Sequence, residues 1–462
     1  MTRSRFAKLL LSVSAMAWWG RKTSRAQSSE SERVIIIGAG MAGLAAAKSL
    51  AEAGCEVILL EARDRVGGRV WTSRKWEEAS IDLGGSWIHG VRGNPLSDLA
   101  DELQVPRLET DFDSAVLYDE SGQKLPDRAW NRIAEFLRVG RKSLRASWRL
   151  DKDISVEAAV AKSLDLDAMS LSEKRLFEFA VSEEIEKSYA ADISELSAWF
   201  LEEGKAFGGG DELFPEGYDA LPKFLQEGLD VRLGTVVSKV AYSDVGVQVT
   251  TKDEVLEADR VVITLPIGVL KQGSVVFEPD LPARKRAAIE ALGAGLLNKV
   301  ALKFPEVFWE KSAHWITRLS ERKGDFTTWL NLVPYTGQPV LIAFNAGSFA
   351  EELESLSDDG VRERAMSVLR QCYGEDIPEP TGVQITRWKS DPFSRCAYSF
   401  PAVGISKHTR RDLAEPIADR VFFAGEATHS DYPSTVHGAY LSGLREAKEI
   451  RKLASHGQLN PD

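Results

Sequence analysis

The sequence predicts an α/β protein in which a Rossmann-like, dinucleotide-binding domain is assembled from segments far apart in the chain. Near the start, an apolar run over residues 33–37 leads into a glycine-rich loop over 38–43. Near the end, the apolar run 421–424 leads into a glycine and an acid at 425–426. The 462 residues exceed what one core usually holds, so we expect a second domain threaded between these segments.

The first segment has the order of elements that a dinucleotide site requires. Residues 33–37 read as a buried parallel strand, because β-branched residues follow Arg33. The Ala-rich run 41–53 reads as a helix that Gly54 ends, and residues 56–60 read as the next strand.

The loop between this strand and this helix is the predicted phosphate site. Gly38 permits the tight turn, Gly40 lets the backbone approach a pyrophosphate beside Ala42, and Gly43 lets the helix pack on the strand. The pyrophosphate would lie at the helix N-terminus, where free N–H groups favour an anion. Glu61 ends the next strand, where its carboxylate can accept the ribose hydroxyls and disfavours a 2′-phosphate.

The rest of the chain divides into segments that differ in the spacing of their apolar residues. Residues 260–266 and 421–424 read as further buried strands, 231–258 as a small antiparallel sheet, 129–199 as a helical insertion, 296–350 as strands and 358–373 as a helix. We therefore predict a discontinuous cofactor domain over 33–90, 215–298 and 388–455. An interleaved α+β substrate-binding domain would take 91–214 and 299–387.

Composition excludes several classes of function. A formal net charge of −11 argues against a nucleic-acid partner and is compatible with a cationic ligand. The three cysteines make no disulfide framework, and the six histidines show no metal-binding spacing, so we expect no metal.

Residues 1–32 read as a leader. Arg3, Arg5 and Lys8 precede a short apolar run over 9–19, which fits an export signal and is too short to span a bilayer. The start is similar to a twin-arginine signal, but Ser4 splits the arginine pair. Periplasmic export and a cytoplasmic location therefore both stay open, and we expect no stable membrane insertion.

Two glycine-rich motifs follow Glu61. Arg63, Gly68 and Arg69 lie in a run whose backbone and guanidinium groups can meet the same phosphates. The next motif, 82–90, carries paired glycines that allow close approach to a flat ring. Its predicted cofactor residues are Gly85, Ser86, Trp87 and Ile88, followed by His89. Together these motifs resemble the flavin-containing amine oxidase family, which implies FAD and a GR2-type cofactor domain.

The family resemblance extends from about residue 33 to 455 and implies further cofactor residues. Glu426 matches the acid that binds the ribityl chain, and Thr435-Val436 opens the helix whose N-terminus faces the flavin's pyrimidine end. The remaining predicted cofactor residues are Val237, Trp388 and Gly425.

Within the family, the chain is most similar to polyamine oxidases. Lys299, in an Asn-Lys-Val context, matches the lysine that holds a water near flavin N5, although a lysine taken alone is more often exposed. Tyr398 matches one wall of the amine slot, with Thr435 opposite. His89 and Phe400 are further predicted substrate contacts.

The cysteine position predicts how FAD is held. Monoamine oxidases attach the cofactor through a cysteine directly before the matching tyrosine, and here that position is Ala397. Cys396 lies one residue earlier, which on a strand turns the sulfur to the other face. We therefore predict non-covalent FAD.

The resemblance implies oxidation of a spermine- or spermidine-like polyamine by hydride transfer to the flavin, with O₂ as acceptor. The ammonium groups of a polyamine that lie far from the reacting bond need carboxylates to bind them. The predicted substrate-binding carboxylate is Glu202, and the further candidates are Glu183, Glu184, Glu203 and Asp211. An L-amino-acid oxidase stays open, with Arg92 as a carboxylate clamp. A histone demethylase and a flavin-binding protein without turnover are further alternatives. The preferred polyamine, the C–N bond cut and the oligomeric state stay undetermined.

Overall fold

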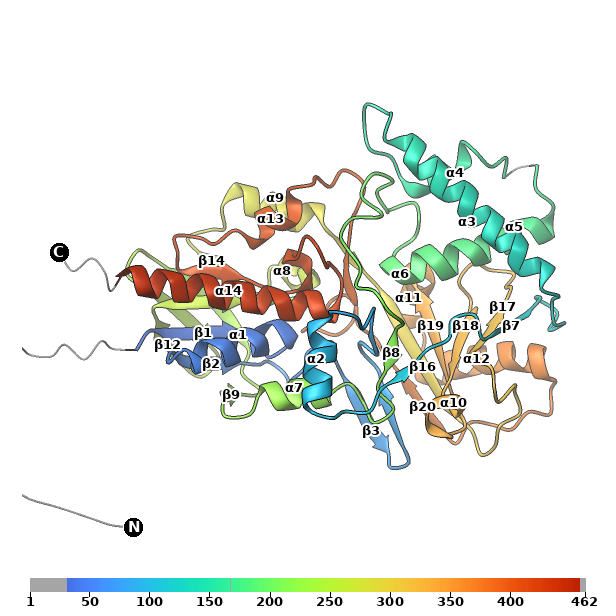
Figure 1. Cartoon of the computed structure of the whole chain (residues 1–462), viewed down its shortest axis with the longest axis horizontal. Helices are drawn as coiled ribbons and strands as arrows, with labels where there is room; N and C mark the ends of the chain where they lie inside the picture. The colour runs from blue at the N-terminus through green and yellow to red at the C-terminus, as the bar shows by residue number, and fades with distance from the viewer. Residues whose placement is uncertain (1–30, 167, 458–462) are drawn as a thin grey trace, which may run out of the picture. The chain divides into compact units, whose positions relative to one another are not determined.

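The computed structural model describes residues 31–166 and 168–457, and residues 32–462 group as one compact unit (Figure 1). The predicted leader, residues 1–32, lies almost wholly outside the described residues. The predicted cofactor and substrate segments all fall within the compact unit.

A five-stranded, all-parallel sheet forms the cofactor half. Its order is β22-β13-β1-β2-β9. The strands are β22 Val421–Phe423, β13 Arg260–Ile263, β1 Arg33–Ile37, β2 Glu56–Leu60 and β9 Asp230–Arg232. Strand β1 lies between β2 and β13, and β22, which precedes the second glycine-rich segment, pairs with β13. The strands that lead into the two glycine-rich segments thus belong to one sheet, with β13 between them.

The two faces of this sheet bury different partners because side chains alternate along a strand. Val34 and Ile36 pack against helices α1 (Met41–Glu52) and α14 (Val436–Gly457). Ile35 and Ile37 pack against a second, four-stranded sheet with order β12-β11-β10-β14. Its strands are β12 Val255–Ala258, β11 Val247–Thr251, β10 Val237–Tyr242 and β14 Val276–Glu278.

This second sheet corrects one prediction. The range 231–258 was expected to be antiparallel throughout, but Asp230–Arg232 pairs in parallel with β2 and closes the edge of the first sheet. Val231 packs against the helix-covered core there, and this tertiary contact decides its partner. The antiparallel sheet begins only at Val237, and β14 joins it in parallel with β10.

A six-stranded mixed sheet forms the other half, with order β20-β16-β19-β18-β17-β7. The strands are β20 Gly382–Ile385, β16 Leu297–Lys303, β19 Val340–Ala346, β18 Thr328–Asn331, β17 Trp315–Arg318 and β7 Ala115–Tyr118. Helix α12 (Asp358–Tyr373) spans the predicted range 358–373 and packs Val361, Ala365 and Met366 on one face of the sheet.

A helical segment covers the end of this sheet (Figure 1). It contains α3 Arg128–Ser147, α4 Val156–Ala161, α5 Leu171–Val181, a π-helix Ser182–Glu186 and α6 Lys187–Tyr189. The helices end ten residues before the predicted limit of 199, because Ala190 takes a left-handed conformation (φ 56°) and stops α6.

Short elements connect these parts. They are β3 Thr72–Trp76, β4 Ala79–Asp82, β5 Trp87–Ile88, α2 Pro95–Glu102, β6 Leu108–Glu109, β8 Glu212–Leu213, α7 Ala220–Leu225, α8 Ile267–Gln272, α9 Ala283–Ala291, β15 Gly293–Gly295, α10 Val333–Thr336, α11 Gly347–Glu354, β21 Tyr398–Phe400, α13 Thr409–Ala414 and a 3₁₀ turn Glu426–Thr428.

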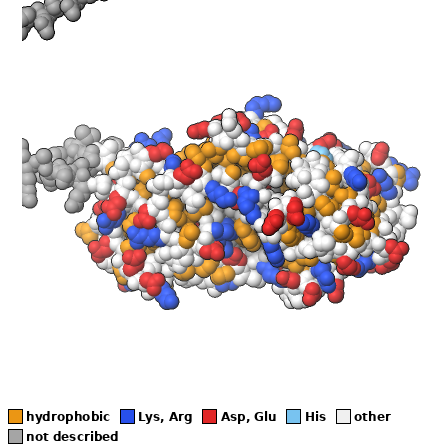
Figure 2. All heavy atoms as spheres, turned by 90° about the horizontal axis from the view of Figure 1, so that it is seen from below, with side chains coloured by type: hydrophobic (Ala, Val, Ile, Leu, Met, Phe, Trp, Pro, Cys, Tyr) orange, Lys and Arg blue, Asp and Glu red, His pale blue; other side chains and the backbone are white. Residues whose placement is uncertain are grey.

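The surface is mixed in charge. On the face in Figure 2, acidic and basic side chains are interspersed, with hydrophobic side chains between them. Across the described residues, no helix combines the length and the hydropathy needed to cross a bilayer.

Candidate active site

One cavity of about 910 Å³ joins the glycine-rich loops to the helical segment. At one end it is lined by Gly38, Gly40 and Glu61, and at the other by Phe179 and Glu184. Most of the predicted site residues line it: Gly38, Gly40, Ala42, Glu61, Arg63, Gly68, Arg69, Gly85, Ser86, Trp87, His89, Val237, Lys299, Trp388, Tyr398, Gly425, Glu426, Thr435 and Val436.

Four predicted residues lie outside this lining. Gly43 faces the backbone of Gly38, and Ile88 is fully buried in the core that α1 and α14 cover. Phe400 packs on Gly293 and into the core of the helical segment. Glu202 lines a separate, smaller pocket.

The glycine loop has free space where a phosphate would lie. Helix α1 begins after Gly40 without a side-chain cap, so its first N–H groups are available to an anion. A Cβ placed on Gly40 would meet no atom within 4 Å, whereas one on Gly43 would lie 1.9 Å from the Gly38 carbonyl oxygen. The two glycines therefore serve different purposes: Gly40 leaves room for a ligand and Gly43 leaves room for the strand.

Glu61 is held by the backbone on both sides of the loop. Its carboxylate accepts hydrogen bonds from the N–H groups of Ala39 (2.7 Å) and Arg63 (2.9 Å), and the residue is 5% exposed. These two bonds fix the carboxylate at the end of β2, on the cavity wall. This is the position from which a carboxylate accepts ribose hydroxyls.

The two predicted phosphate arginines bind carboxylates from the C-terminal part of the chain. Arg63 donates to both oxygens of Asp391 (2.6 and 2.9 Å) and to Ser394. Arg69 donates to Glu426 (3.0 Å) and to the Ala397 carbonyl. Their charges are thus compensated within the protein, and they join the motif that follows Glu61 to residues between Asp391 and Glu426.

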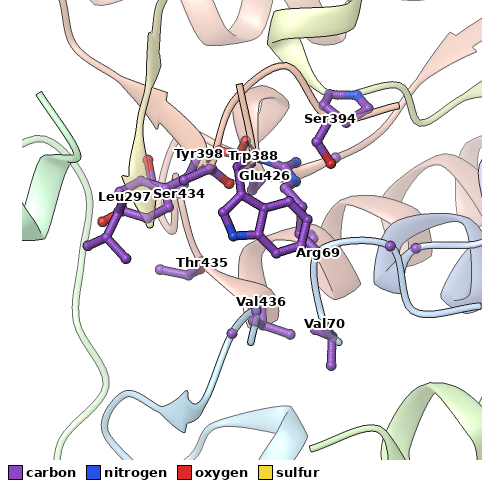
Figure 3. Close-up of a pocket in the computed structure, with 18 of the residues that line it drawn as sticks. Arg69, Val70, Leu297, Trp388, Ser394, Tyr398, Glu426, Ser434, Thr435 and Val436 are labelled. Carbon is purple, nitrogen blue, oxygen red and sulfur yellow. Dashed lines mark hydrogen bonds and ion pairs between the residues drawn. The ribbon is translucent and has the colours of Figure 1, made fainter. Parts of the chain in front are cut away.

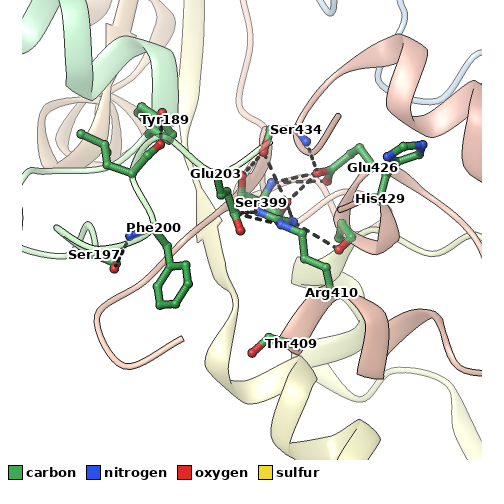
Figure 4. Close-up of polar contacts among 12 residues, drawn as sticks. Tyr189, Ser197, Phe200, Glu203, Ser399, Thr409, Arg410, Glu426, His429 and Ser434 are labelled. Atoms are coloured by element: carbon green, nitrogen blue, oxygen red, sulfur yellow. Dashed lines mark hydrogen bonds and ion pairs between the residues drawn. The ribbon is translucent and has the colours of Figure 1, made fainter. Parts of the chain in front are cut away.

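Glu426 lies at the centre of a buried polar network (Figure 4). It accepts from the Ser399 hydroxyl (2.6 Å) and the Ser434 N–H (3.1 Å). Arg410 donates to Ser399 (2.9 Å) and, through Nη2, to Glu203 (2.6 Å). Burial opposes ionisation of Glu426, but Arg69, Ser399 and Arg410 hold the pKa of its carboxyl below the usual value.

Sequence reasoning missed Arg410, Ser399 and Ser434. Arg410 precedes Glu426 by 16 residues and follows Glu203 by 207, so no local pattern links it to either acid. The one local signal is weak: Ser399 directly follows the predicted slot residue Tyr398 and therefore faces the opposite side of β21.

Lys299 is buried on β16 and makes three hydrogen bonds. Its Nζ donates to the carbonyls of Asp82 and Gly84 (both 2.7 Å) and to the Ser86 hydroxyl (2.5 Å). The residue is 4% exposed, so the sequence context outweighs the ordinary preference of lysine for the surface. Burial lowers the pKa of the Lys299 ammonium, and the nearby Asp82 carboxylate partly offsets this effect.

Tyr398 and Thr435 lie on different sides of the same space (Figure 3). The Tyr398 hydroxyl donates to the Lys187 carbonyl (2.5 Å), and burial raises its pKa. The Thr435 hydroxyl accepts from the Gly438 N–H (2.9 Å) and so caps α14. Tyr398 thus presents its ring to the cavity, while the Thr435 hydroxyl is already engaged.

The other predicted residues near this space have defined partners. His89 is 2.7 Å from Asp211 through Nδ1, and its side chain is 57% exposed, which places it at the outer wall. Ala397 lines the cavity, whereas Cys396 is 1% exposed and packs in the core on the other side of the parallel sheet. The described residues contain no group of three or more His, Cys, Asp or Glu side chains that could hold a metal.

Comparisons with known proteins identify the family and several relatives. A model of the flavin containing amine oxidoreductases matches residues 41–451. The chain is 38% identical to lysine-specific histone demethylase 1 homolog 2 of Arabidopsis thaliana, over 92% of this chain and 59% of that protein. It is 35% identical to polyamine oxidase 2 of the same plant, over 93% of this chain and 90% of that protein.

A solved structure shares the fold. Wild-type putrescine oxidase bound to putrescine superposes with a TM-score of 0.76 at 21% identity, covering 91% of this chain and 99% of that one. The chain spans less than two thirds of the demethylase relatives, 59% and 54% of the first two. Polyamine oxidases and demethylases are thus about equally similar in sequence.

Proposed function

The chain belongs to the flavin-containing amine oxidoreductases, and we propose that within this family it oxidises polyamines, with O₂ as the electron acceptor. One observation carries the proposal: a single cavity joins the FAD-type glycine cradle to a chamber walled by Tyr398 and ending in carboxylates. The reaction would convert a secondary amine, water and O₂ into an aldehyde, a shorter amine and H₂O₂.

The residues present fit FAD, the cofactor of this family. Gly40 leaves open space before an uncapped helix, Glu61 presents a fixed carboxylate, and Glu426 lies further along the same cavity. When bound, FAD supplies a hydride acceptor for the carbon beside the amine nitrogen. The burial of Cys396 on the far side of the sheet supports our proposal of non-covalent binding.

The chain's own residues position the substrate and handle protons. Tyr398, fixed by its hydrogen bond to Lys187, offers a flat apolar wall for the reacting amine. Lys299 holds a proton at Nζ beside Gly84 and Ser86, and its lowered pKa makes that proton easier to release than an ordinary lysine proton. The apolar walls exclude water from the reacting bond.

Three of the four arginines that line the cavity are paired with carboxylates, which favours an amine over an amino acid as the substrate. An amino-acid oxidase needs a free arginine for the substrate carboxylate. Arg63, Arg69 and Arg410 are each paired with a carboxylate, and Arg92 lies outside the lining. The fourth arginine of the lining, Arg395, has no carboxylate partner among the described residues and lies beside Gly268 of α8, in the cofactor half. A demethylase remains the second candidate, because those relatives are as similar as the polyamine oxidases.

A peroxide-release assay with purified holoprotein tests the proposal. The substrates are spermine, spermidine, putrescine, a monoamine, an L-amino-acid mixture and a dimethyl-lysine peptide. We expect peroxide with the polyamines at rates at least tenfold above the others. Formaldehyde release from the peptide alone would favour the demethylase, and activity on amino acids alone would overturn both.

We further propose that residues 1–32 direct export, with cytoplasmic retention as the alternative. The basic start and short apolar run support this. Mass measurement of the mature chain after cell fractionation tests it, since export predicts a periplasmic form that lacks the leader.

A further inference from the structure

A second pocket, of about 200 Å³, lies within the helical segment beside the main cavity. The two share the lining residues Glu184 and Tyr189, so they are neighbours across this pair. The Tyr189 hydroxyl donates to the Leu201 carbonyl and forms part of the partition. We call this second pocket the side pocket.

The walls of the side pocket are apolar, and its charges are few. Its lining is Phe136, Leu137, Gly140, Arg141, Leu144, Val160, Phe177, Ala180, Val181, Glu184, Ile185, Tyr189, Leu201 and Glu202. Two carboxylates and one guanidinium are its charged groups. Such a lining suits a methylene chain that carries a cation.

Three of the five candidate carboxylates already have side-chain partners. Glu183 pairs with Lys187 and accepts from Thr327 (2.7 Å). Glu203 pairs with the buried Arg410. Asp211 lies 2.7 Å from His89 Nδ1 and accepts from the Gly90 N–H. A substrate ammonium would have to displace these partners to bind there.

Glu184 has no such partner. Among the described carboxylates that line the main cavity, it is the one whose side chain makes no hydrogen bond or ion pair. Arg141 also lines the side pocket, but it makes no ion pair with Glu184 in the described structure. Burial raises the pKa of the Glu184 carboxyl, and the charge of Arg141 offsets this effect only in part.

The π-helix Ser182–Glu186 places Glu184 at the boundary between the two pockets. Its wider turn carries the Lys187 N–H to the Ser182 carbonyl, five residues back. Glu184 and Ser188 then both line the main cavity, while Ile185 lines the side pocket. Local π-turns of this kind are frequent at functional sites.

We propose that the side pocket is the distal subsite for the amine substrate, with Glu184 as the group that binds the remote ammonium at its entrance. This inference rests on the proposed function, because it assigns a second binding point to the substrate of the main cavity. The ligand class is a long di- or polyamine whose far methylene segment enters the side pocket toward Glu202.

Steady-state kinetics with α,ω-diamines of four to twelve carbons and the matching monoamines test the role of Glu184. Glu184→Gln should raise KM for the longer diamines about tenfold, since a charged hydrogen bond is lost. KM for monoamines and kcat for both classes should stay within twofold. Glu178→Gln is the matched control, because Glu178 lies on α5 and lines neither pocket.

Filling the side pocket tests the subsite independently. A Cβ on Gly140 would lie 3.9 Å from Val160, so Gly140→Ala fits, whereas the side chain of Gly140→Leu would extend into the pocket. Gly140→Leu should lower kcat/KM for the longest diamines at least tenfold and leave putrescine within twofold. Thermal melting and FAD content establish that each variant is folded.

The outcomes separate the two proposals. If the wild-type protein oxidises no amine of the series, the proposed function fails. If it oxidises diamines but Glu184→Gln and Gly140→Leu change all chain lengths alike, or none, the subsite is wrong and the function stands.

Discussion

At Lys299, burial and hydrogen bonding act in opposite directions on one ammonium group. Burial disfavours the charge, while three acceptors and the nearby Asp82 carboxylate favour it. The balance is a lysine that stays in place and gives up its proton more readily than a surface lysine. That combination suits a group that passes a proton within a closed cavity.

Replacing Lys299 with Met keeps the apolar stem and removes the proton. We expect flavin reduction or re-oxidation to slow by about a hundredfold or more, the range that general acid–base groups contribute. Stopped-flow absorbance of the flavin, with and without O₂, measures the two half-reactions separately. Unchanged turnover would remove Lys299 from the mechanism.

Lys285 provides the matched control for this substitution. It is also buried, and it donates to the carbonyls of Leu413 (2.7 Å) and Glu415 (2.6 Å), with its pKa lowered by burial to about 7. It lies outside the cavity lining. Lys285→Met should therefore lower the melting temperature and leave the flavin rates within twofold.

Single residues differ in how well the sequence predicts them. Glu61 could be placed because it follows the glycine motif and the next strand, and Lys299 because its Asn-Lys-Val context resembles the family's lysine strand. Glu202 could not be separated from Glu203, because these adjacent residues, in the turn that follows the helical segment, line different pockets, and only the tertiary packing decides which. Arg410 has no local signal at all.

At the scale of elements, two glycines of the strand–loop–helix unit that begins at Arg33 have different roles: Gly43 allows the helix to pack on the strand, and Gly40 leaves space for a ligand. Gly43→Ala would place a methyl 1.9 Å from the Gly38 carbonyl oxygen, so the helix would have to move from the strand. Gly40→Ala would meet no protein atom and would occupy the space before the helix N-terminus.

The two substitutions should therefore affect different measurements. We expect Gly43→Ala to lower the free energy of unfolding of the apoprotein by about 2 kcal/mol or more, through overpacking. Gly40→Ala should leave apoprotein stability within about 0.5 kcal/mol and weaken FAD binding at least tenfold. Urea unfolding measures the stability of the apoprotein, and a flavin fluorescence titration measures the affinity for FAD. Equal losses of stability would contradict the assignment.

Two histidines near the start of α14 favour the neutral form: half-buried His429, which directly follows the 3₁₀ turn, and buried His437, in the first turn of α14. Burial lowers the pKa of His429 and of His437 to about 4. The His429 Nδ1 accepts from the N–H groups of Asp431 (3.2 Å) and Tyr432 (3.0 Å), which a protonated nitrogen could not do. Protonation would therefore disrupt this turn.

The sign of the pH effect follows from these shifts. The unfolded chain protonates both histidines below about pH 6.5 and the folded chain only near pH 4, so stability is lost as pH falls through this window. Between pH 7 and 5 we expect a loss of about 1–2 kcal/mol per histidine. His437→Gln should flatten this slope in urea unfolding; an unchanged slope would show that His437 is not the cause.

Elements whose buried apolar residues recur at a regular spacing could be predicted from the sequence. Elements whose position depends on hydrogen bonding to a distant segment could not. The helix over 358–373 follows from its apolar spacing and its cap at Ser357. Strand β9 was assigned to the wrong sheet because three residues carry too little pattern to choose between two edges. Hydrogen bonding to β2, a segment 170 residues earlier, makes that choice.

At the scale of the whole molecule, Arg410 links two parts of the chain that are distant in sequence, through an ion pair and a hydrogen bond. It lies on α13, beside the parallel sheet, and pairs with Glu203 from the segment that follows the helical insertion. The guanidinium is 3% exposed and also donates to Ser399, which binds Glu426. Displacement of Glu203 would thus be transmitted to the cofactor side of the cavity.

A double-mutant cycle on this pair measures the link. Arg410→Met leaves the Glu203 carboxylate unpaired at the cavity wall, so we expect a loss of about 3 kcal/mol in unfolding free energy. Adding Glu203→Gln should recover part of that loss, which gives a coupling energy of about 1–2 kcal/mol. The exposed pair Lys389–Glu351 is the control, with an expected coupling below about 1 kcal/mol.

The same cycle, repeated with FAD bound, tests the route to the cofactor. Arg410 and Arg69 together hold the Glu426 carboxyl in its charged form, so losing Arg410 should weaken FAD binding about tenfold beyond the effect of Glu203→Gln. Ser399→Ala, which removes the connecting hydroxyl, should reproduce most of that loss without leaving a buried charge. If Ser399→Ala leaves FAD affinity unchanged, Arg410 acts on stability alone and the two halves of the cavity are not coupled through Glu426.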